Sequence, residues 1–326
     1  MPVKMTRRAL LASTAAVPLA TSFSTLRAQD NDGAKSNNIG EIVDAHVHIW
    51  TSDTKNFPLA AGFSAKDLWF PSYSAEELME LGKVVGVGRF NLVQMTWYGV
   101  DHSYILDVIS RNPKQFVGTG IVPAVTDVSL ADPGATMIDL SRGGVYAFRI
   151  RGKSARPKFT DGERWMDHPG YDKMFTAGAE HNLALSYLMS PLDLPELDRM
   201  CSRFPATPVI IDHFCLIGRK NTFIEEEIQQ LCKMAQHKRV MVKLGGFYAL
   251  GAKRPPYLDM LPLMRRVVDA FGPHRCMWES DAPLQTKEVH TFSAAVDIIQ
   301  KHADFLSESD KYQILVKTAE DFFFNR

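Results

Sequence analysis

Short apolar runs alternate eight times with longer amphipathic stretches between residues 42 and 323, and few folds accommodate this rhythm. The apolar runs predict strands over residues 42–49, 89–97, 116–122, 144–150, 183–189, 208–214, 240–246 and 275–281. Helical spacing covers residues 74–85, 101–112, 127–141, 166–182, 193–204, 225–237, 257–271, 293–305 and 310–323. Strands joined by helical crossovers are parallel, and eight such units predict a single-domain α/β fold, the (β/α)8 TIM barrel.

The same rhythm also suits a doubly wound open sheet. In that fold a GxGxxG turn often follows the first strand, and no such turn follows residues 42–49. The chain has 326 residues, of which 45% are hydrophobic and 23% charged, and this is enough for one large domain. The length of the repeating part is also close to the roughly 250 residues of a typical barrel, so the barrel is favoured.

The charge balance bears on the kind of partner. Lysine plus arginine and aspartate plus glutamate both total 37, and no basic tract is interleaved with aromatic residues, which argues against nucleic-acid binding. After residue 28 no apolar run approaches the roughly 20 residues that span a bilayer, which argues against membrane insertion. We expect a globular protein that acts on a small molecule, as a monomer or a homo-oligomer.

The cysteines show no metal-binding or redox pattern. No two of them have CxxC spacing, and all lie in apolar or helical surroundings. We therefore expect buried thiols rather than disulfides at Cys201, Cys215, Cys232 and Cys276.

The first 28 residues have the composition of an export signal. Positive charges precede an apolar run rich in small residues, and Ala28 is a suitable cleavage point. The adjacent Arg7 and Arg8 resemble those of a twin-arginine leader, which predicts a periplasmic protein, or a cytoplasmic one if the leader does not function. Residues 29–40 are polar and predict a linker, which leaves residues 41–326 for the barrel.

Reactive side chains gather where the predicted strands end. The carboxyl ends of the strands form the active-site face of a TIM barrel, so these side chains would meet at one end of the barrel. In chain order they are His46 and His48 (first strand), Arg149 and Arg151 (fourth), Asp212 and His213 (sixth), Lys243 (seventh) and Asp281 (eighth).

Four of these residues suggest a metal site. His46 and His48 stand two apart on a strand and so share a face, and neutral imidazole is a common ligand of zinc. His213 and Asp281 could complete a site for one divalent metal, most simply Zn²⁺, with room for a water molecule. The alternative is that the histidines are hydrogen-bonded core residues and that Asp281 caps the following helix.

Three stretches resemble a known family. "DAHVHIW" (44–50), "VIIDHF" (209–214) and "MWESDAP" (277–283) are similar to the signature stretches of the amidohydrolase-related family, within its branch of TIM-barrel lactonases. "VYAFRIR" (145–151) and "NLVQMT" (91–96) resemble the fourth and second strands of that branch. The resemblance covers nearly all of residues 40–326.

The resemblance implies hydrolysis of a small lactone. In this interpretation the metal held by the histidines polarises the ring carbonyl, and Asp281, with His213 beside it, takes a proton from water and returns it to the ring oxygen. Arginine is the usual partner of a carboxylate or sulfonate, so we expect an anionic lactone. The expected contacts to this substrate come from Arg149, Arg151 and Lys243, with Tyr187, Gln94, Trp50 and Trp97 as further contacts or simple packing residues.

Departures from the family pattern leave alternatives open. Glu279 and Cys215 stand where the family usually has glycine, and Glu279 could point into the barrel beneath Asp281. Lys153 lies beyond the fourth strand, so a carbamylated lysine and a second metal are not expected. A metal-free lactonase, a metal-dependent decarboxylase of an aromatic or unsaturated acid, and an exported binding protein without catalysis are the competing hypotheses.

Overall fold

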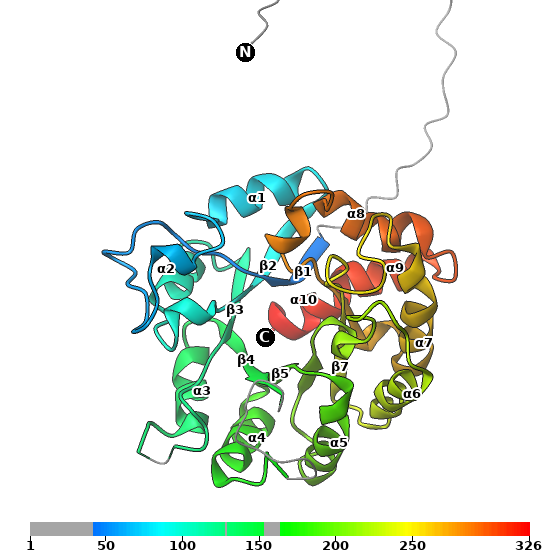
Figure 1. Ribbon diagram of the computed structural model, residues 1–326. Coiled ribbons are helices and arrows are strands. Elements are labelled where there is room, and N and C mark those ends of the chain that lie inside the picture. Colours follow the sequence, from blue (N-terminus) through cyan, green and yellow to red (C-terminus); the bar gives the residue numbers. More distant parts are fainter. Residues whose placement is uncertain (1–41, 128, 153–163) are drawn as a thin grey trace, which may run out of the picture. The chain divides into compact units, whose positions relative to one another are not determined.

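Eight strands lie in sequence order in one parallel sheet, and the helices form a ring outside it (Figure 1). The structure is a computed structural model that describes residues 42–127, 129–152 and 164–326. The predicted (β/α)8 barrel in a single domain is therefore confirmed. The strands are β1 Ile42–Val47, β2 Val87–Val93, β3 Phe116–Gly120, β4 Val145–Arg151, β5 Ala184–Leu188, β6 Val209–Ile211, β7 Val240–Leu244 and β8 Cys276–Trp278.

One α-helix follows each of the first seven strands, and three follow the last. Local sequence explains where several of them begin: Ser74 and Glu77 form a capping box at the start of the first helix, and Asp132 caps the third, which starts at Pro133. The helices are α1 Ala75–Lys83, α2 Ser103–Arg111, α3 Pro133–Ser141, α4 Pro169–His181, α5 Leu194–Arg203, α6 Glu225–Lys233, α7 Leu261–Phe271, α8 Phe292–Asp297, α9 Glu308–Tyr312 and α10 Thr318–Phe323.

The barrel closes between β1 and the segment that follows β8. Val47 pairs with Ala282 in parallel, and the His48 N–H donates to the Ala282 carbonyl at 2.9 Å. Beneath this pair, Asp44 Oδ1 accepts hydrogen bonds from the backbone N–H of His46 at 3.1 Å and of Ser280 at 2.9 Å. Closure therefore brings the first and last predicted signature stretches side by side.

All six residues of β1 are buried, as expected for a strand that is covered by helices outside and by side chains inside the barrel. Aromatic pairs contribute to the packing, such as Phe90 stacked on Phe116 between β2 and β3. The thiols of Cys201, Cys215 and Cys276 are free and buried, and that of Cys232 is free and partly buried. In the described part of the chain no helix combines the length and apolar character needed to cross a membrane.

Most strands end earlier than the sequence predicts, three of them by more than two residues. β2, β6 and β8 end at Val93, Ile211 and Trp278, three or four residues before the predicted ends. At β6 the backbone gives the reason: His213, Phe214 and Cys215 all have positive φ, and this left-handed conformation turns the chain out of the sheet. Asp281 also has a positive φ, of +61°, but Ala282 after it still pairs with Val47. The predicted export signal (1–28), the predicted linker (29–40) and Lys153 lie outside the described residues.

Candidate active site

A cavity of about 450 Å³ opens at the carboxyl ends of the strands. This is the face of a TIM barrel where active sites are found. Five of the site residues predicted from the sequence line it, namely His48, Arg149, Arg151, His213 and Asp281.

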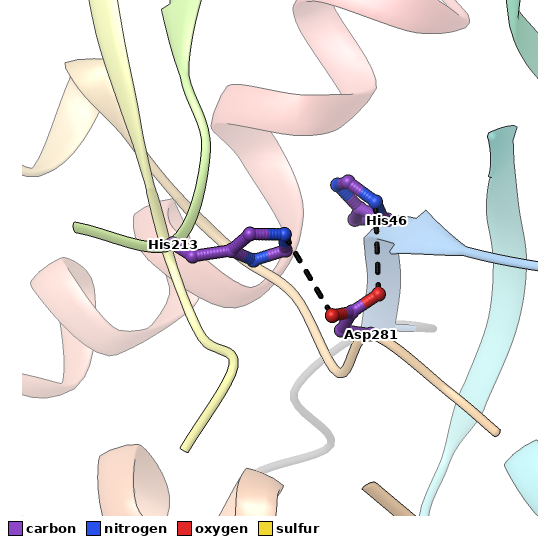
Figure 2. Close-up of side chains that lie close together, drawn as sticks. All are labelled: His46, His213 and Asp281. Carbon is purple, nitrogen blue, oxygen red and sulfur yellow. Dashed lines mark ion pairs between the residues drawn. The ribbon is translucent and has the colours of Figure 1, made fainter. Parts of the chain in front are cut away.

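His46, His213 and Asp281 lie close together (Figure 2), and the last two line this cavity. His46 comes from β1, His213 follows β6 and Asp281 follows β8. The Nε2 atoms of His46 and His213 lie 3.7 Å from Asp281 Oδ1 and Oδ2, respectively, and His48 Nε2 lies 3.2 Å from Oδ1. The barrel thus brings together the four residues predicted to hold a metal, with the three histidines around the Asp281 carboxylate.

Asp281 is held in place through both its backbone and its side chain. Its φ of +61° is uncommon for a residue other than glycine, and its N–H donates to the His46 carbonyl at 2.9 Å across the barrel closure. The Tyr248 hydroxyl donates to Asp281 Oδ2 at 2.7 Å. Oδ1 has no hydrogen-bond partner in the described part of the chain and faces the histidines.

Two of the histidines present Nε2 because protein acceptors occupy Nδ1. His48 Nδ1 donates to the Val93 carbonyl at 2.8 Å, and His213 Nδ1 donates to Glu279 Oε1 at 2.6 Å. A carboxylate or carbonyl on the far nitrogen is the usual way in which proteins orient a metal-binding histidine. Glu279 therefore supports His213 from within the barrel, in line with the expected inward direction of its side chain.

His46 lies between a carboxylate and an ammonium group. Its Nδ1 is 3.2 Å from Glu279 Oε2 and 3.1 Å from Lys243 Nζ. In the tautomer whose Nδ1 proton points at Glu279, Nε2 is a lone-pair donor toward Asp281. Arg149 Nη2 lies 3.3 Å from the same Nε2.

Burial gives one histidine of the site a lowered pKa, and nearby carboxylates give another a raised pKa. Burial lowers the pKa of His48 to about 4, so His48 is neutral at pH 7 and its Nε2 lone pair faces Asp281 Oδ1. Burial also opposes the charged form of His213, but the carboxylates of Glu279 and Asp281 outweigh it and raise its pKa to about 9. A cation among these groups would separate the facing lone pairs and displace the His213 proton.

The donor set fits a divalent metal. Two groups of buried side chains have ligand atoms within 4.8 Å of one another: His46, His213 and Asp281, and His46, Asp212 and Glu279. In the first group two Nε2 atoms and a carboxylate meet, with His48 Nε2 beside them, and nitrogen and oxygen donors of this kind suit zinc. The second group already has a cation, because Lys243 Nζ lies 3.0 Å from Asp212 Oδ1.

Lys243 and Tyr187 occupy positions other than the predicted substrate contacts. Both are fully buried, and neither is among the described residues that line the cavity. Lys243 is bound by Asp212 beneath the site, and the Tyr187 hydroxyl lies 3.3 Å from Met166 Sδ. Their positions on the strands suggested that both side chains could reach the substrate, but both are enclosed within the protein.

The arginines that the sequence assigned to the substrate do reach the cavity. Arg149 is nearly buried, with its side chain 7% exposed, and its Nη2 lies 3.8 Å from Asp212 Oδ2. Arg151 is exposed and donates to Thr96 Oγ1 at 2.9 Å. Gln94 also lines the cavity. The cavity therefore offers guanidinium groups both near the histidines and at its mouth.

Most of the cavity wall was not predicted from the sequence, and three of the unpredicted residues are Tyr248, Arg219 and Trp69. Tyr248 follows β7, Arg219 lies six residues after His213, and Trp69 lies in the long segment between β1 and α1. Only Tyr248, next to the end of a strand, had a positional signal that could have identified it. Trp50 and Trp97, which the sequence suggested as pocket walls, are buried against each other with ring centroids 5.0 Å apart and do not line the cavity.

Asp44 predicts a pH dependence of stability. Burial raises its pKa to about 7 from 3.8, so its contribution to stability is complete below pH 3.8 and is lost as the pH rises through 7. The side chain of the Asp44→Asn variant stays neutral at every pH. We therefore expect the free energy of unfolding of the variant, relative to that of the wild type, to increase by roughly 2–3 kcal/mol between pH 5 and pH 8. Urea unfolding in the presence of chelator measures this difference at each pH, and a difference that does not change with pH would contradict the raised pKa of Asp44.

The comparison with known proteins agrees with the fold and with the sequence resemblance. L-fucono-1,5-lactonase from Burkholderia ambifaria is 28% identical over 256 residues, which cover 76% of this chain and 82% of the relative. 4-Sulfomuconolactone hydrolase from Hydrogenophaga intermedia is 24% identical over 240 residues, which cover 74% of each chain.

A solved structure has the same architecture. An amidohydrolase from Burkholderia multivorans with bound zinc superimposes with a TM-score of 0.67 at 18% identity, covering 86% of this chain and 98% of that one. At this identity the likeness shows the fold. The sequence itself matches the amidohydrolase family over residues 43–324, that is, from the first barrel strand to the end of the last helix. The chain belongs to the amidohydrolase family.

Proposed function

We propose that this protein hydrolyses the ester bond of a small lactone that carries a carboxylate or sulfonate, of the muconolactone or pyrone type. The observation that carries the proposal is the convergence of two histidine Nε2 atoms on Asp281 in a cavity that Arg149 also lines. This combination places an electrophile site, a base and an anion-binding group within one small volume. The two curated relatives act on lactones according to their names, and one of these lactones is sulfonated.

The residues that would hold a metal are His46, His48 and His213 through Nε2, together with Asp281. When bound, a divalent ion such as Zn²⁺ supplies a Lewis acid that polarises the lactone carbonyl and stabilises the negative charge that forms on its oxygen. Glu279 and the Val93 carbonyl hold the far nitrogens of His213 and His48, so these rings keep their orientation with or without the ion.

Asp281 has the position and the charge of a general base. Although burial opposes ionisation, the positive charge of His213 keeps the pKa of Asp281 well below its ordinary value, so the carboxylate is ionised at neutral pH. It accepts a proton from the water that attacks the carbonyl carbon. A carbon–oxygen bond to the water oxygen forms, the bond to the ring oxygen breaks, and the proton passes from Asp281 to that ring oxygen.

The Tyr248 hydroxyl limits how the Asp281 carboxylate can rotate. Its hydrogen bond to Oδ2 at 2.7 Å leaves Oδ1 directed at the histidines. Arg149 stands on the same side, with its guanidinium 3.3 Å from His46 Nε2, and would bind the anionic group of the lactone next to the reacting carbonyl.

Metal analysis combined with a lactone panel tests the proposal. We expect about one zinc ion per purified chain and ring opening of carboxylated or sulfonated lactones that stops when a chelator removes the metal. Ring opening that persists without metal would indicate a metal-free lactonase, in which the histidines act as hydrogen-bond donors to the carbonyl. No ring opening, with release of CO₂ from aromatic or unsaturated acids, would replace the proposal with a decarboxylase. Metal binding without turnover of either panel would indicate a binding protein.

Arg149→Gln tests the anionic character of the substrate. Glutamine keeps polar atoms in the cavity but loses the charge, so KM for an anionic lactone should rise about 10- to 100-fold, whereas KM for its neutral methyl ester should change little. Steady-state kinetics on the acid and ester pair measure this difference. Arg142→Gln, at an exposed position between α3 and the start of β4, is the control. Equal changes for acid and ester would contradict the assigned role.

A further inference from the structure

Polar and apolar side chains line the cavity together. His48, His213 and Asp281 are at most 5% exposed, and the buried Met95, Met189 and Leu250 also line it. The partly exposed lining includes Arg151 and Arg219 and four apolar residues, which we refer to as the apolar rim: Trp69, Leu188, Leu216 and Leu284.

The rim residues come from separate parts of the barrel face. Trp69 precedes α1, Leu188 ends β5, Leu216 follows β6 and Leu284 follows β8. Partly exposed apolar side chains that surround one opening are unusual on a protein surface unless a ligand or a partner covers them. Because all four belong to the wall of the candidate active site, a ligand bound in that cavity would bury them.

Trp69 is the most exposed residue of the rim and is held rigidly. Its side chain is 45% exposed, yet its indole packs edge-to-face against two buried tryptophans, with centroids 5.9 Å from Trp50 and 5.4 Å from Trp97. The interplanar angles of 87° and 90° show that both neighbours meet it nearly at right angles. A fixed indole with one free side can pack against an aromatic group with little loss of side-chain entropy.

The size of the cavity also exceeds what a simple ring requires. A carboxylated monocyclic lactone has about ten non-hydrogen atoms, whereas cavities of roughly 300–1,000 Å³ take ligands of drug size. The cavity measures about 450 Å³. A small lactone bound at Asp281 would therefore leave the apolar rim uncovered.

We propose that the lactone carries an apolar substituent, aromatic in preference to aliphatic, which packs on Trp69 and the leucines of the rim while its ester group lies at Asp281. This inference rests on the proposed lactonase function and narrows its substrate class to amphipathic lactones. Burial of a phenyl group removes about 100 Å² of apolar surface from water, which at roughly 25 cal/mol per Å² corresponds to about a 70-fold gain in kcat/KM.

A matched pair of substrates tests the proposal on the purified protein. The pair is a carboxylated lactone with a phenyl substituent and the same lactone with a methyl group in its place. We expect kcat/KM for the phenyl compound to be about 10- to 50-fold higher. If the wild type opens neither lactone, the proposed function fails; if it opens both at equal rates, only the inference about the rim is overturned.

Rim variants assign the preference to particular side chains. Trp69→Ala should lower the ratio of the two kcat/KM values to within about threefold of one, whereas Trp69→Phe should retain most of it. Leu284→Ala is a second rim variant that should lower the ratio in the same direction. The control is Leu192→Ala, because Leu192 is 88% exposed but does not line the cavity. A ratio that both rim variants leave at the wild-type value would overturn the proposal even if the phenyl compound is preferred.

Discussion

Asp281→Asn should lower kcat by on the order of 10²- to 10⁴-fold on whichever lactone the wild type opens. The amide has nearly the shape of the carboxylate and can still accept the hydrogen bond from Tyr248, but it cannot take a proton from water. If the carboxylate acts mainly as the base, the fall appears in kcat with a smaller change in KM. Steady-state kinetics at saturating substrate measure it.

Metal content must be measured in parallel, because Asp281 is also placed as a ligand. Three histidine nitrogens remain near the site in the variant, so metal added in excess should restore occupancy without restoring turnover. Asp269→Asn is the matched control, since Asp269 is exposed on α7 and pairs only with the exposed Arg265 among the ion pairs of the described residues. Turnover within about threefold of the wild type, or full recovery with added metal, would rule out Asp281 as the base.

The barrel and the position of its site were predictable because both follow from periodicity. Alternating strands and helices specify parallel strands, and parallel strands in a barrel have their carboxyl ends at one face. His46, His213 and Asp281 are separated by up to 235 residues along the chain, yet each stands at or just after a strand end, and the structure brings them together. Local sequence therefore carried most of the information about which residues meet.

The sequence could not predict how far a side chain within a strand reaches, or how the loops run after a strand has ended. Lys243 lies within β7 and points inward, where its full length is enclosed with Asp212, so it does not reach the mouth of the cavity. Arg219 and Trp69 lie in loops whose paths have no period, and no spacing rule assigns them to the cavity wall. The left-handed backbone at His213 and Asp281 also ended the alternation on which parity arguments rely.

Lys243→Met should lower the free energy of unfolding by about 3–5 kcal/mol, which is the usual cost of leaving a buried charge without its partner. The Lys243 side chain is fully buried, and its Nζ lies 3.0 Å from Asp212 Oδ1 and 3.1 Å from His46 Nδ1. Although burial opposes ionisation of Asp212, the charge of Lys243 outweighs it and keeps the pKa of this carboxyl well below its ordinary value. Methionine fills similar space but leaves the carboxylate with Ser186 Oγ at 2.9 Å, and among the described residues the remaining basic groups near it are His46 at 3.7 Å and Arg149 at 3.8 Å.

The double variant Lys243→Met with Asp212→Asn removes both charges and should recover much of this loss, so the two single effects should not add. Urea unfolding in the presence of chelator measures all four proteins without a contribution from bound metal. Lys301→Met is the control, because Lys301 pairs with Asp297 at a similar distance, 2.9 Å, but its side chain is 64% exposed. Exposed pairs of this kind are worth about 0–1 kcal/mol. If the losses of the two single variants add in the double variant, the lysine stabilises the barrel by packing alone, and its charge has no part in holding Asp212 ionised beneath the histidines.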